Sequence, residues 1–144
     1  MLSSEYAEWL QLKTNRPYRL LSDAEWLYAA TSGGRQASPP LGLGLANCGG
    51  WGWQCGSRWD GKSTAPVGSF PPNSFGLHDM YGNVWEWTID CAERSYVVGG
   101  GCRKHSLRGY GWGTVMVPLN TEAATNDYPD HRTYDVGFRV ARPL

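Results

Sequence analysis

The chain has 144 residues, and 13 Lys and Arg balance 13 Asp and Glu, so its formal net charge is zero. This length suits one compact domain over residues 1–144, and the neutral charge lacks the basic footprint of a nucleic-acid-binding protein. No apolar stretch approaches the roughly 20 residues that span a bilayer, and no basic-then-apolar signal segment opens the chain. We therefore expect neither nucleic-acid binding nor membrane insertion, while the compartment and the oligomeric state stay open.

Two helices are predicted near the N-terminus. Apolar and aromatic side chains at helical spacing, among them Tyr6 and Trp9, predict a helix over residues 4–13 with a buried aromatic face. Ser22 and Glu25 then have the spacing of a capping box, in which each residue bonds the other's backbone amide. A second helix is therefore expected to begin directly after Ser22 and to end at the glycine pair that follows.

Residues 34–64 show no periodicity and contain eight glycines with several tryptophans. A loop of this length in a small domain is functional, tied down by a ligand, or disordered. Because tryptophan is rare in disordered segments, we predict that this loop is ordered.

The four cysteines match no zinc-binding pattern, since they lie seven, 36 and 11 residues apart. Ordinary buried thiols are the favoured interpretation, because free cysteine is often buried. Disulfides are the alternative for an exported protein, and Cys48 with Cys55 is then the candidate pair.

Short strands are predicted in the second half of the chain. The dipeptide Gly82-Asn83 indicates a turn, and residues 84–88 then alternate as a strand would. Residues 96–98 and 136–140 are two further candidate strands. Two early helices followed by short antiparallel strands and long loops predict an α+β fold.

Residues 79–87 read DMYGNVWEW and closely resemble the DM-x-GNVWEW signature of the formylglycine-generating-enzyme, or sulfatase-modifying-factor, family. Three other segments resemble that family in the same order: YRLLSDAEWLYAA at 18–30, TAPVGSFPPNSFGL at 64–77 and VGFRVAR at 136–142. The resemblance implies a C-type-lectin-like α+β fold. Family members usually carry a further N-terminal stretch, so the chain is expected to be a fragment, a truncated product or a minimal version of the domain.

The family's oxidases bind Cu(I) through two thiolates five residues apart, because soft thiolates suit that ion. Aligned with the family pattern, Cys102 takes a serine position, and the two thiolate positions fall on His105 and Tyr110. The resemblance thus predicts no copper site and no oxidase activity for this chain alone. A divergent oxidase, completed by His105 and Tyr110 or by a second subunit, is the alternative.

The resemblance also implies structural calcium, which prefers six to eight oxygen ligands. One site would use the side chains of Asp79 and Glu86 with the carbonyl groups of Gly82 and Val84. The alternative is that Glu86 caps backbone amides and Asp79 begins a turn. A second site would use Asn47, the carbonyl of Cys48, and Asp60.

Ligand contact is expected in segment 103–135, which lines the substrate groove of the family's enzymes and varies in its retroelement-encoded, diversified binders. Aromatic, amide and basic side chains interleave there as they do in adaptable binding surfaces. The candidates are Arg103, His105, Arg108, Tyr110, Trp112, Asn126, Tyr128, Arg132 and Tyr134. The predicted function is a calcium-stabilised, non-oxidase module that binds a protein, peptide or glycan. The alternative is that Trp112 and Tyr128 belong to the core and the other side chains are merely solvated.

Overall fold

The structure is a computed structural model, and it describes residues 2–35, 44–50, 53–97, 100–114 and 124–144. In chain order its elements are α1 (Ser3–Thr14), β1 (Arg19–Leu20), α2 (Asp23–Ala30), β2 (Gly49–Gly50), β3 (Trp53–Gln54), β4 (Trp85–Arg94), β5 (Cys102–Arg108), β6 (Ala124–Asp127), β7 (Val136–Phe138) and β8 (Val140–Ala141). Two helices precede a set of strands, as the predicted α+β class requires. None of the helices described is long and apolar enough to cross a membrane.

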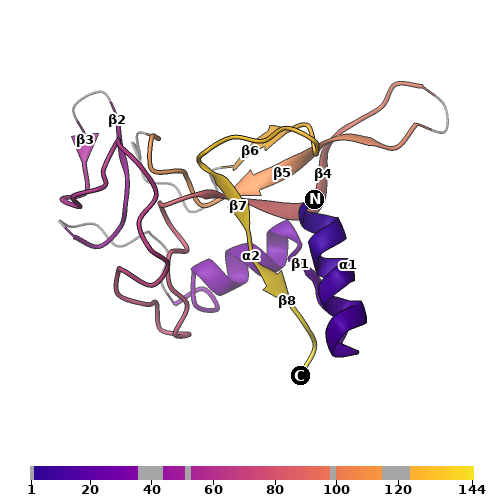
Figure 1. Ribbon diagram of the computed structural model, residues 1–144, viewed down its shortest axis with the longest axis horizontal. Coiled ribbons are helices and arrows are strands. Elements are labelled where there is room, and N and C mark those ends of the chain that lie inside the picture. The colour runs from indigo at the N-terminus through magenta and orange to yellow at the C-terminus, as the bar shows by residue number, and fades with distance from the viewer. Residues whose placement is uncertain (1, 36–43, 51–52, 98–99, 115–123) are drawn as a thin grey trace.

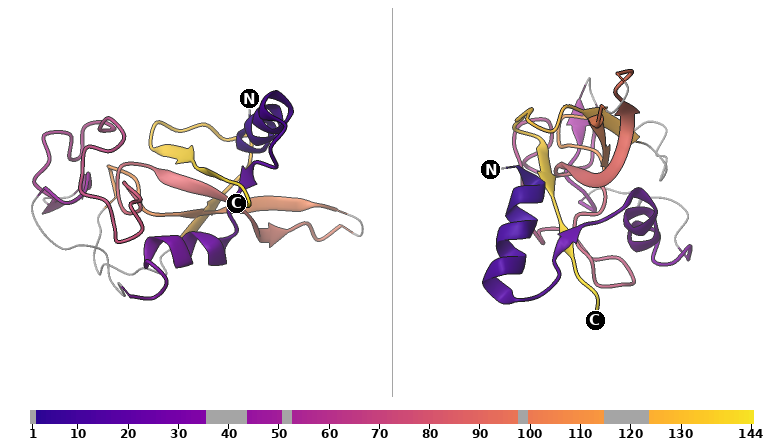
Figure 2. Two further views of the ribbon diagram at one scale, coloured as in Figure 1. Left: turned by 90° about the horizontal axis from the view of Figure 1, so that it is seen from below. Right: turned by 90° about the vertical axis from the view of Figure 1, so that its right-hand side faces the viewer.

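The central sheet has four strands in the order β6-β5-β4-β7. Strand β5 is antiparallel to both of its neighbours, whereas β7 runs parallel to β4. Two smaller antiparallel pairs, β1 with β8 and β2 with β3, complete the strands. The C-terminal segment passes between α1 and α2, and the far end of the β4–β5 hairpin projects away from the other elements (Figures 1 and 2).

The capping box of the second helix is confirmed. The Ser22 hydroxyl accepts from the Glu25 amide at 3.2 Å, and the Glu25 carboxylate accepts from the Ser22 amide at 2.9 Å. The first helix extends the prediction by one residue at each end, but its aromatic face is not buried. Trp9 is 43% exposed and Ala7 is the buried residue, because α1 packs against β1 through a narrow contact.

Strands β5 and β6 are not among the strands that the sequence predicts. Strand β5 has the sequence CRKHSLR, whose polar residues do not alternate with apolar ones, so pairing with β4 and β6 rather than local pattern makes it a strand. The strand expected at 96–98 is wrong for Tyr96 and Val97, which lie in the connection after β4, and Val98 lies outside the described residues. The C-terminal strand is split into β7 and β8 at Arg139.

The main core forms around Trp26, which is 1% exposed. Its ring meets Tyr81 edge-on, with the ring centroids 5.9 Å apart, and Leu21, Met80 and Tyr110 belong to the same cluster. This cluster joins α2 to the segment before β4 and to the loop after β5. The core therefore depends on a few large aromatic side chains, each of which buries much apolar area.

The predicted turn at Gly82-Asn83 is confirmed, since both residues have positive φ, 83° and 68°. A Cβ on Gly82 would lie 2.5 Å from the carbonyl oxygen of Asn47. The Asn83 side chain accepts from the Ala65 amide at 2.8 Å and from the Asn47 side chain at 3.3 Å. Glycine is required here because the loop containing Asn47 touches the turn, and Asn83 fastens that loop in place.

All four cysteines are paired, Cys48 with Cys55 and Cys91 with Cys102, so the favoured interpretation of buried thiols was wrong. The β2–β3 pair brings the first two cysteines together, with their Cα atoms 5.5 Å apart. The other two lie on the adjacent strands β4 and β5. Sequence spacing alone shows neither pairing, because both depend on how the strands associate.

Candidate functional site

The two positions aligned with copper-binding thiolates have different surroundings. His105 lies on β5 and lines a hollow together with Ile89 and Pro129. Tyr110 follows β5 in the left-handed conformation, with φ of 68° and only 7% of its surface exposed. Its ring lies 5.2 Å from that of Trp85, centroid to centroid, at a tilt of 45°. Tyr110 therefore packs the core and does not contribute to an exposed binding surface, contrary to the prediction.

The residues of the first calcium set meet near the start of β4. The Asp79 Oδ2 atom accepts from the Gly68 amide at 2.7 Å, whereas its Oδ1 atom is buried with no hydrogen-bond partner among the described residues. The Val84 amide donates to the Gly82 carbonyl at 3.0 Å, which closes the turn between the two predicted carbonyl ligands. The unpaired Asp79 oxygen is the type of ligand that a hard cation prefers.

Glu86, the fourth member of that set, is shared with other groups. Arg139 donates to both carboxylate oxygens, at 2.6 and 2.5 Å, and the Trp26 indole N–H donates at 2.7 Å. Burial lowers the pKa of Arg139, but the hydrogen bond and the charge of Glu86 outweigh this and raise the pKa above its ordinary value. A carboxylate has about four lone-pair sites, so one remains for a cation, although the charge of Glu86 is already neutralised. If a cation binds here, Asp79 would therefore be its anionic ligand.

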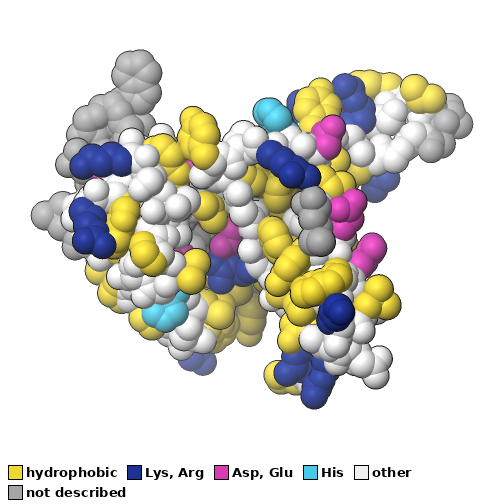
Figure 3. All heavy atoms as spheres, viewed as in Figure 1, with side chains coloured by type: hydrophobic (Ala, Val, Ile, Leu, Met, Phe, Trp, Pro, Cys, Tyr) yellow, Lys and Arg dark blue, Asp and Glu magenta, His cyan; other side chains and the backbone are white. Residues whose placement is uncertain are grey.

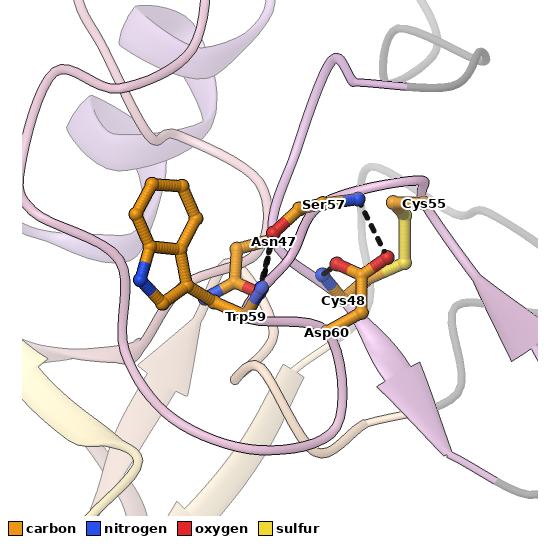
Figure 4. The surroundings of a disulfide bond; sticks show 6 residues. All are labelled: Asn47, Cys48, Cys55, Ser57, Trp59 and Asp60. Carbon is orange, nitrogen blue, oxygen red and sulfur yellow. Dashed lines mark hydrogen bonds between the residues drawn. A yellow bond between two sulfur atoms is a disulfide. The ribbon is translucent and has the colours of Figure 1, made fainter.

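The second calcium set comes together in the loop before β4, as Figure 4 shows. Asp60 is 5% exposed, and its carboxylate accepts from the Cys48 amide at 3.2 Å and the Ser57 amide at 2.9 Å. The Asn47 side-chain oxygen accepts from the Ser57 hydroxyl at 3.4 Å, and its amide group donates to the Ser63 carbonyl at 2.9 Å.

None of the ion pairs formed by the described part of the chain involves Asp60. A buried carboxylate is unfavourable without a counter-charge or ample hydrogen bonding. The donor set around Asp60 therefore fits a calcium ion, which would supply the missing positive charge. The Cys48–Cys55 disulfide holds one side of this set in place.

Asp23 was not singled out by sequence and organises the sheet face beside α2. Its carboxylate accepts from Thr88 at 2.6 Å, from Ser106 at 3.0 Å and from Arg108 at 2.8 Å. Burial raises the pKa of Asp23, but these hydrogen bonds together hold it below its ordinary value. Arg108, a predicted ligand-binding residue, thus serves to join β5 to α2. Asp23 lies within the family motif at 18–30, but its hydrogen-bond partners are more than 60 residues away in sequence, so the motif does not show its role.

Three predicted ligand-binding residues lie at the β5–β6 edge. The Arg103 guanidinium forms an ion pair with Glu93 at 2.9 Å and donates to the Tyr128 hydroxyl at 3.4 Å. Lys104 lies over the Tyr128 ring, 5.1 Å from its centroid. Asn126 is exposed on β6, opposite Ser106. This edge is a network of charged and aromatic side chains that already bind one another.

The half-buried Trp112 and the exposed Tyr134 form a separate aromatic pair. Their ring centroids lie 5.4 Å apart at a tilt of 38°, and Tyr134 is 79% exposed. The two rings line an open hollow together with Lys62, Ser63 and Thr64. Arg132, the last candidate, lines another hollow beside Trp87 and Phe138. The nine predicted residues therefore do not converge on one site, and Lys62 is a candidate that the sequence reading missed.

Residues 3–144 match the family described as the sulfatase-modifying factor enzyme 1-like domain. The formylglycine-generating enzyme of Mycobacterium tuberculosis is 47% identical over 81 residues, which is 49% of this chain and 26% of that protein. The mouse protein named inactive C-alpha-formylglycine-generating enzyme 2 is 28% identical over 144 residues, 88% of this chain and 43% of its own length.

Solved structures show the same fold. PvdO from Pseudomonas aeruginosa superposes with a TM-score of 0.79 at 35% identity, covering 98% of this chain and 58% of PvdO. Treponema denticola variable protein 1 superposes with a TM-score of 0.67 at 27% identity, covering 89% of this chain and 49% of that protein. The chain thus spans between about a quarter and about three fifths of these relatives. It belongs to the sulfatase-modifying factor family and has the C-type-lectin-like fold of the formylglycine-generating enzymes.

Proposed function

We propose that this chain is a ligand-binding module of its family that lacks the oxidase chemistry and is held together by calcium. The pairing of its cysteines is the observation that supports the absence of oxidase chemistry. All four are used in two disulfides, so none is left as a thiolate for Cu(I). At the aligned positions, moreover, an imidazole and a buried phenol replace the thiolates. A member of the family that lacks the copper-binding thiolates is better suited to binding than to oxidation.

Two relatives support this proposal. The mouse relative carries the word inactive in its name, and the Treponema denticola neighbour is named a variable protein. A domain of this fold thus serves proteins that are not described as oxidases. A reverse-transcriptase gene beside this one, with a near-copy of the coding region for residues 103–135, would assign the chain to the diversified binders.

The contact surface that we favour is the hollow between Trp112 and Tyr134. Rigid aromatic side chains bind with little loss of conformational entropy and present both an apolar face and a polar edge. Lys62, Ser63 and Thr64 add an ammonium group and two hydroxyls at its border. A peptide or a glycan that combines an apolar face with hydrogen-bonding groups matches this surface.

Calcium would bind at two places. Asn47 and Asp60, with the Cys48 carbonyl, would hold one ion, and Asp79, with the Gly82 and Val84 carbonyls and a shared Glu86, would hold the other. When bound, the first ion would supply positive charge to the buried Asp60 carboxylate, and the second would supply it to the half-buried Asp79 carboxylate. The first set also ties residues 44–64 to the turn before β4, through the contacts between Asn47 and Asn83.

A binding screen on peptide and glycan arrays tests the proposed surface. We expect wild-type ligands to bind at least about tenfold more weakly to Trp112→Ala and Tyr134→Ala, since centrally placed aromatic anchors contribute about 1–3 kcal/mol each. Tyr96→Ala is the matched control, because Tyr96 is 91% exposed on the β4–β5 connection. Copper-dependent oxidation of a cysteinyl peptide by the purified chain would refute the proposal and favour the divergent oxidase.

A further inference from the structure

A second unassigned surface lies where the N-terminus of α1 approaches β4 and β7. Two adjoining hollows there have cavity volumes of about 200 and about 70 Å³. Both are lined by Leu2, Ser3, Trp87 and Pro129, so together they form one depression, which we call the Trp87 groove. It shares no lining residue with the hollow at Trp112 and Tyr134.

The Trp87 groove is largely apolar and remains partly open to solvent. Val136 and Phe138 of β7 line one part, and Leu20 and Ile89 line the other. Phe138 is 38% exposed and Ile89 is 54% exposed. Figure 3 shows hydrophobic side chains gathered where α1 meets the neighbouring strands.

The apolar surface continues onto α1. The Tyr6 ring lies 5.3 Å from that of Phe138 and 5.5 Å from that of Trp9, measured between centroids. Phe138, Tyr6 and Trp9 thus form an aromatic row that leads from the Trp87 groove along the helix. A row of this shape suits an elongated ligand better than a compact one.

The border of the groove is polar and basic. His131 and Arg132 line it, and no Asp or Glu occurs among the described residues that do. His131 is paired with Asp127 at 2.7 Å, whereas Arg132 forms no ion pair within the described part of the chain. The Thr133 Oγ1 atom is buried there and has no hydrogen-bond partner among the residues described. An unpaired buried hydroxyl is unfavourable, so it indicates a polar group that is supplied on binding.

Strand β7 adds a free sheet edge to this groove. It lies at one edge of the four-stranded sheet, so one side of its backbone meets no strand of that sheet. All three residues of β7 line the Trp87 groove. Exposed sheet edges bind extended peptides by adding a strand, with backbone hydrogen bonds for affinity and side-chain pockets for selectivity.

We propose that the Trp87 groove binds an extended polypeptide segment with alternating apolar side chains and one acidic residue. The segment lies along the free edge of β7 and packs apolar side chains against the exposed parts of Phe138 and Ile89. Its carboxylate pairs with Arg132, and one of its polar groups bonds the Thr133 hydroxyl. This surface is independent of the glycan or peptide surface at Trp112, so either assignment can fail without the other.

The test uses a displayed library of random peptides of about eight residues, a length that matches one added strand. We expect the selected peptides to alternate apolar residues around an acidic one. Arg132→Glu is expected to weaken their binding about tenfold, as for a charge reversal at an interface. Replacing the acidic peptide residue by lysine should restore binding to that variant. Phe138→Ser should weaken binding by a similar factor.

Three controls keep the outcome decisive. Arg16→Glu reverses an exposed charge outside the groove and should bind like wild type. Thr133→Val should keep the unfolding midpoint while weakening binding a few-fold, because only the bound state uses the hydroxyl. Circular dichroism confirms that each variant is folded.

The proposal is overturned if no selected peptide distinguishes wild type from Arg132→Glu and Phe138→Ser. It is also overturned if Trp112→Ala alone abolishes binding, since the peptides then occupy the other surface. Sedimentation that finds a dimer dissociated by Phe138→Ser would assign the Trp87 groove to a second copy of the chain instead.

Discussion

Glu86 and Arg139 form the most buried ion pair among those described, with the Glu86 side chain 6% exposed and that of Arg139 24% exposed. The carboxylate accepts two bonds from the guanidinium and a third from the Trp26 indole. Taking both charges out of water is unfavourable, so the net stabilisation by such a pair is small. Removing only one partner is strongly destabilising, because an uncompensated charge is left in the core.

Arg139→Met therefore has a predictable effect. The variant leaves the Glu86 carboxylate buried with the Trp26 N–H as its remaining donor among the described residues, and we expect a loss of about 3–5 kcal/mol in the free energy of unfolding. Urea unfolding measures it, with Arg142→Met as the control, since Arg142 is exposed and its side chain bonds the Pro143 carbonyl and no acidic group among the described residues. The double variant Glu86→Gln/Arg139→Met should recover much of the loss. Equal stability of Arg139→Met and the control would contradict this role.

Helix α2 shows how one element is set by residues close in sequence. The Glu25 carboxylate accepts from the amide of the N-cap residue Ser22, and it also accepts two bonds of 2.6 Å from Arg19. The Arg19 hydrogen bonds, followed by the Ser22 amide, lower the pKa of Glu25 from 4.5 to about 2. A carboxyl group with a lower pKa in the folded state stabilises the fold above its unfolded pKa. That stabilisation is lost as the pH falls from about 4.5 to about 2.

Glu25→Gln is expected to reduce stability at pH 7 by less than about 1 kcal/mol, because the pair is nearly half exposed and screened by solvent. The difference from wild type should shrink as the pH falls through this window, since wild-type Glu25 then becomes neutral as well. Thermal unfolding at several pH values measures this. Glu8→Gln, an exposed position on α1, should show no such trend, and a constant difference for Glu25→Gln would exclude the charge as the cause.

At the scale of the whole molecule, residues 44–50 and 53–64 are held against the turn before β4 and the loop after β5. These residues contain two very short strands, and their contacts to the rest include the bonds of Asn47 with Asn83 and of Gly61 with Trp112. Two acidic side chains, the buried Asp60 and the half-buried Asp79, lie at or near this junction. A cation bound to either set would stabilise one side of the contact between Asn47 and Asn83, and through it the association of the loop with the turn before β4.

Calcium is accordingly predicted to raise the melting temperature. At about 100 times the dissociation constant, a bound ion adds about 2.7 kcal/mol, which corresponds to roughly 5–10 °C for a domain of this size. Asp60→Asn and Asp79→Asn should each reduce the shift measured between EDTA and excess calcium. Asp130→Asn, at an exposed turn, should keep it. Identical melting curves of the wild type in EDTA and in calcium would rule out calcium as a structural ligand.

Local features of this protein could be predicted from its sequence, whereas the arrangement of the candidate sites could not. The capping box at Ser22, the turn at Gly82-Asn83 and the family motifs involve residues only a few positions apart, so their physical causes are visible in the sequence. The replacement of both thiolates by His105 and Tyr110 is likewise a statement about residue type. From these features the sequence alone predicts the fold class, the family and the absence of the two copper-binding thiolates.

Only the tertiary structure decided which distant residues meet. Strands β5 and β6 exist because of pairing across the sheet, and that pairing brings Cys91 to Cys102 and Arg108 to Asp23. Tyr110 was predicted to lie on the binding surface, but it lies in the core because the chain turns sharply after β5. The Trp87 groove arises from segments at both ends of the chain. Long-range contacts are selected by the total free energy of the fold, and no short stretch of sequence contains that information.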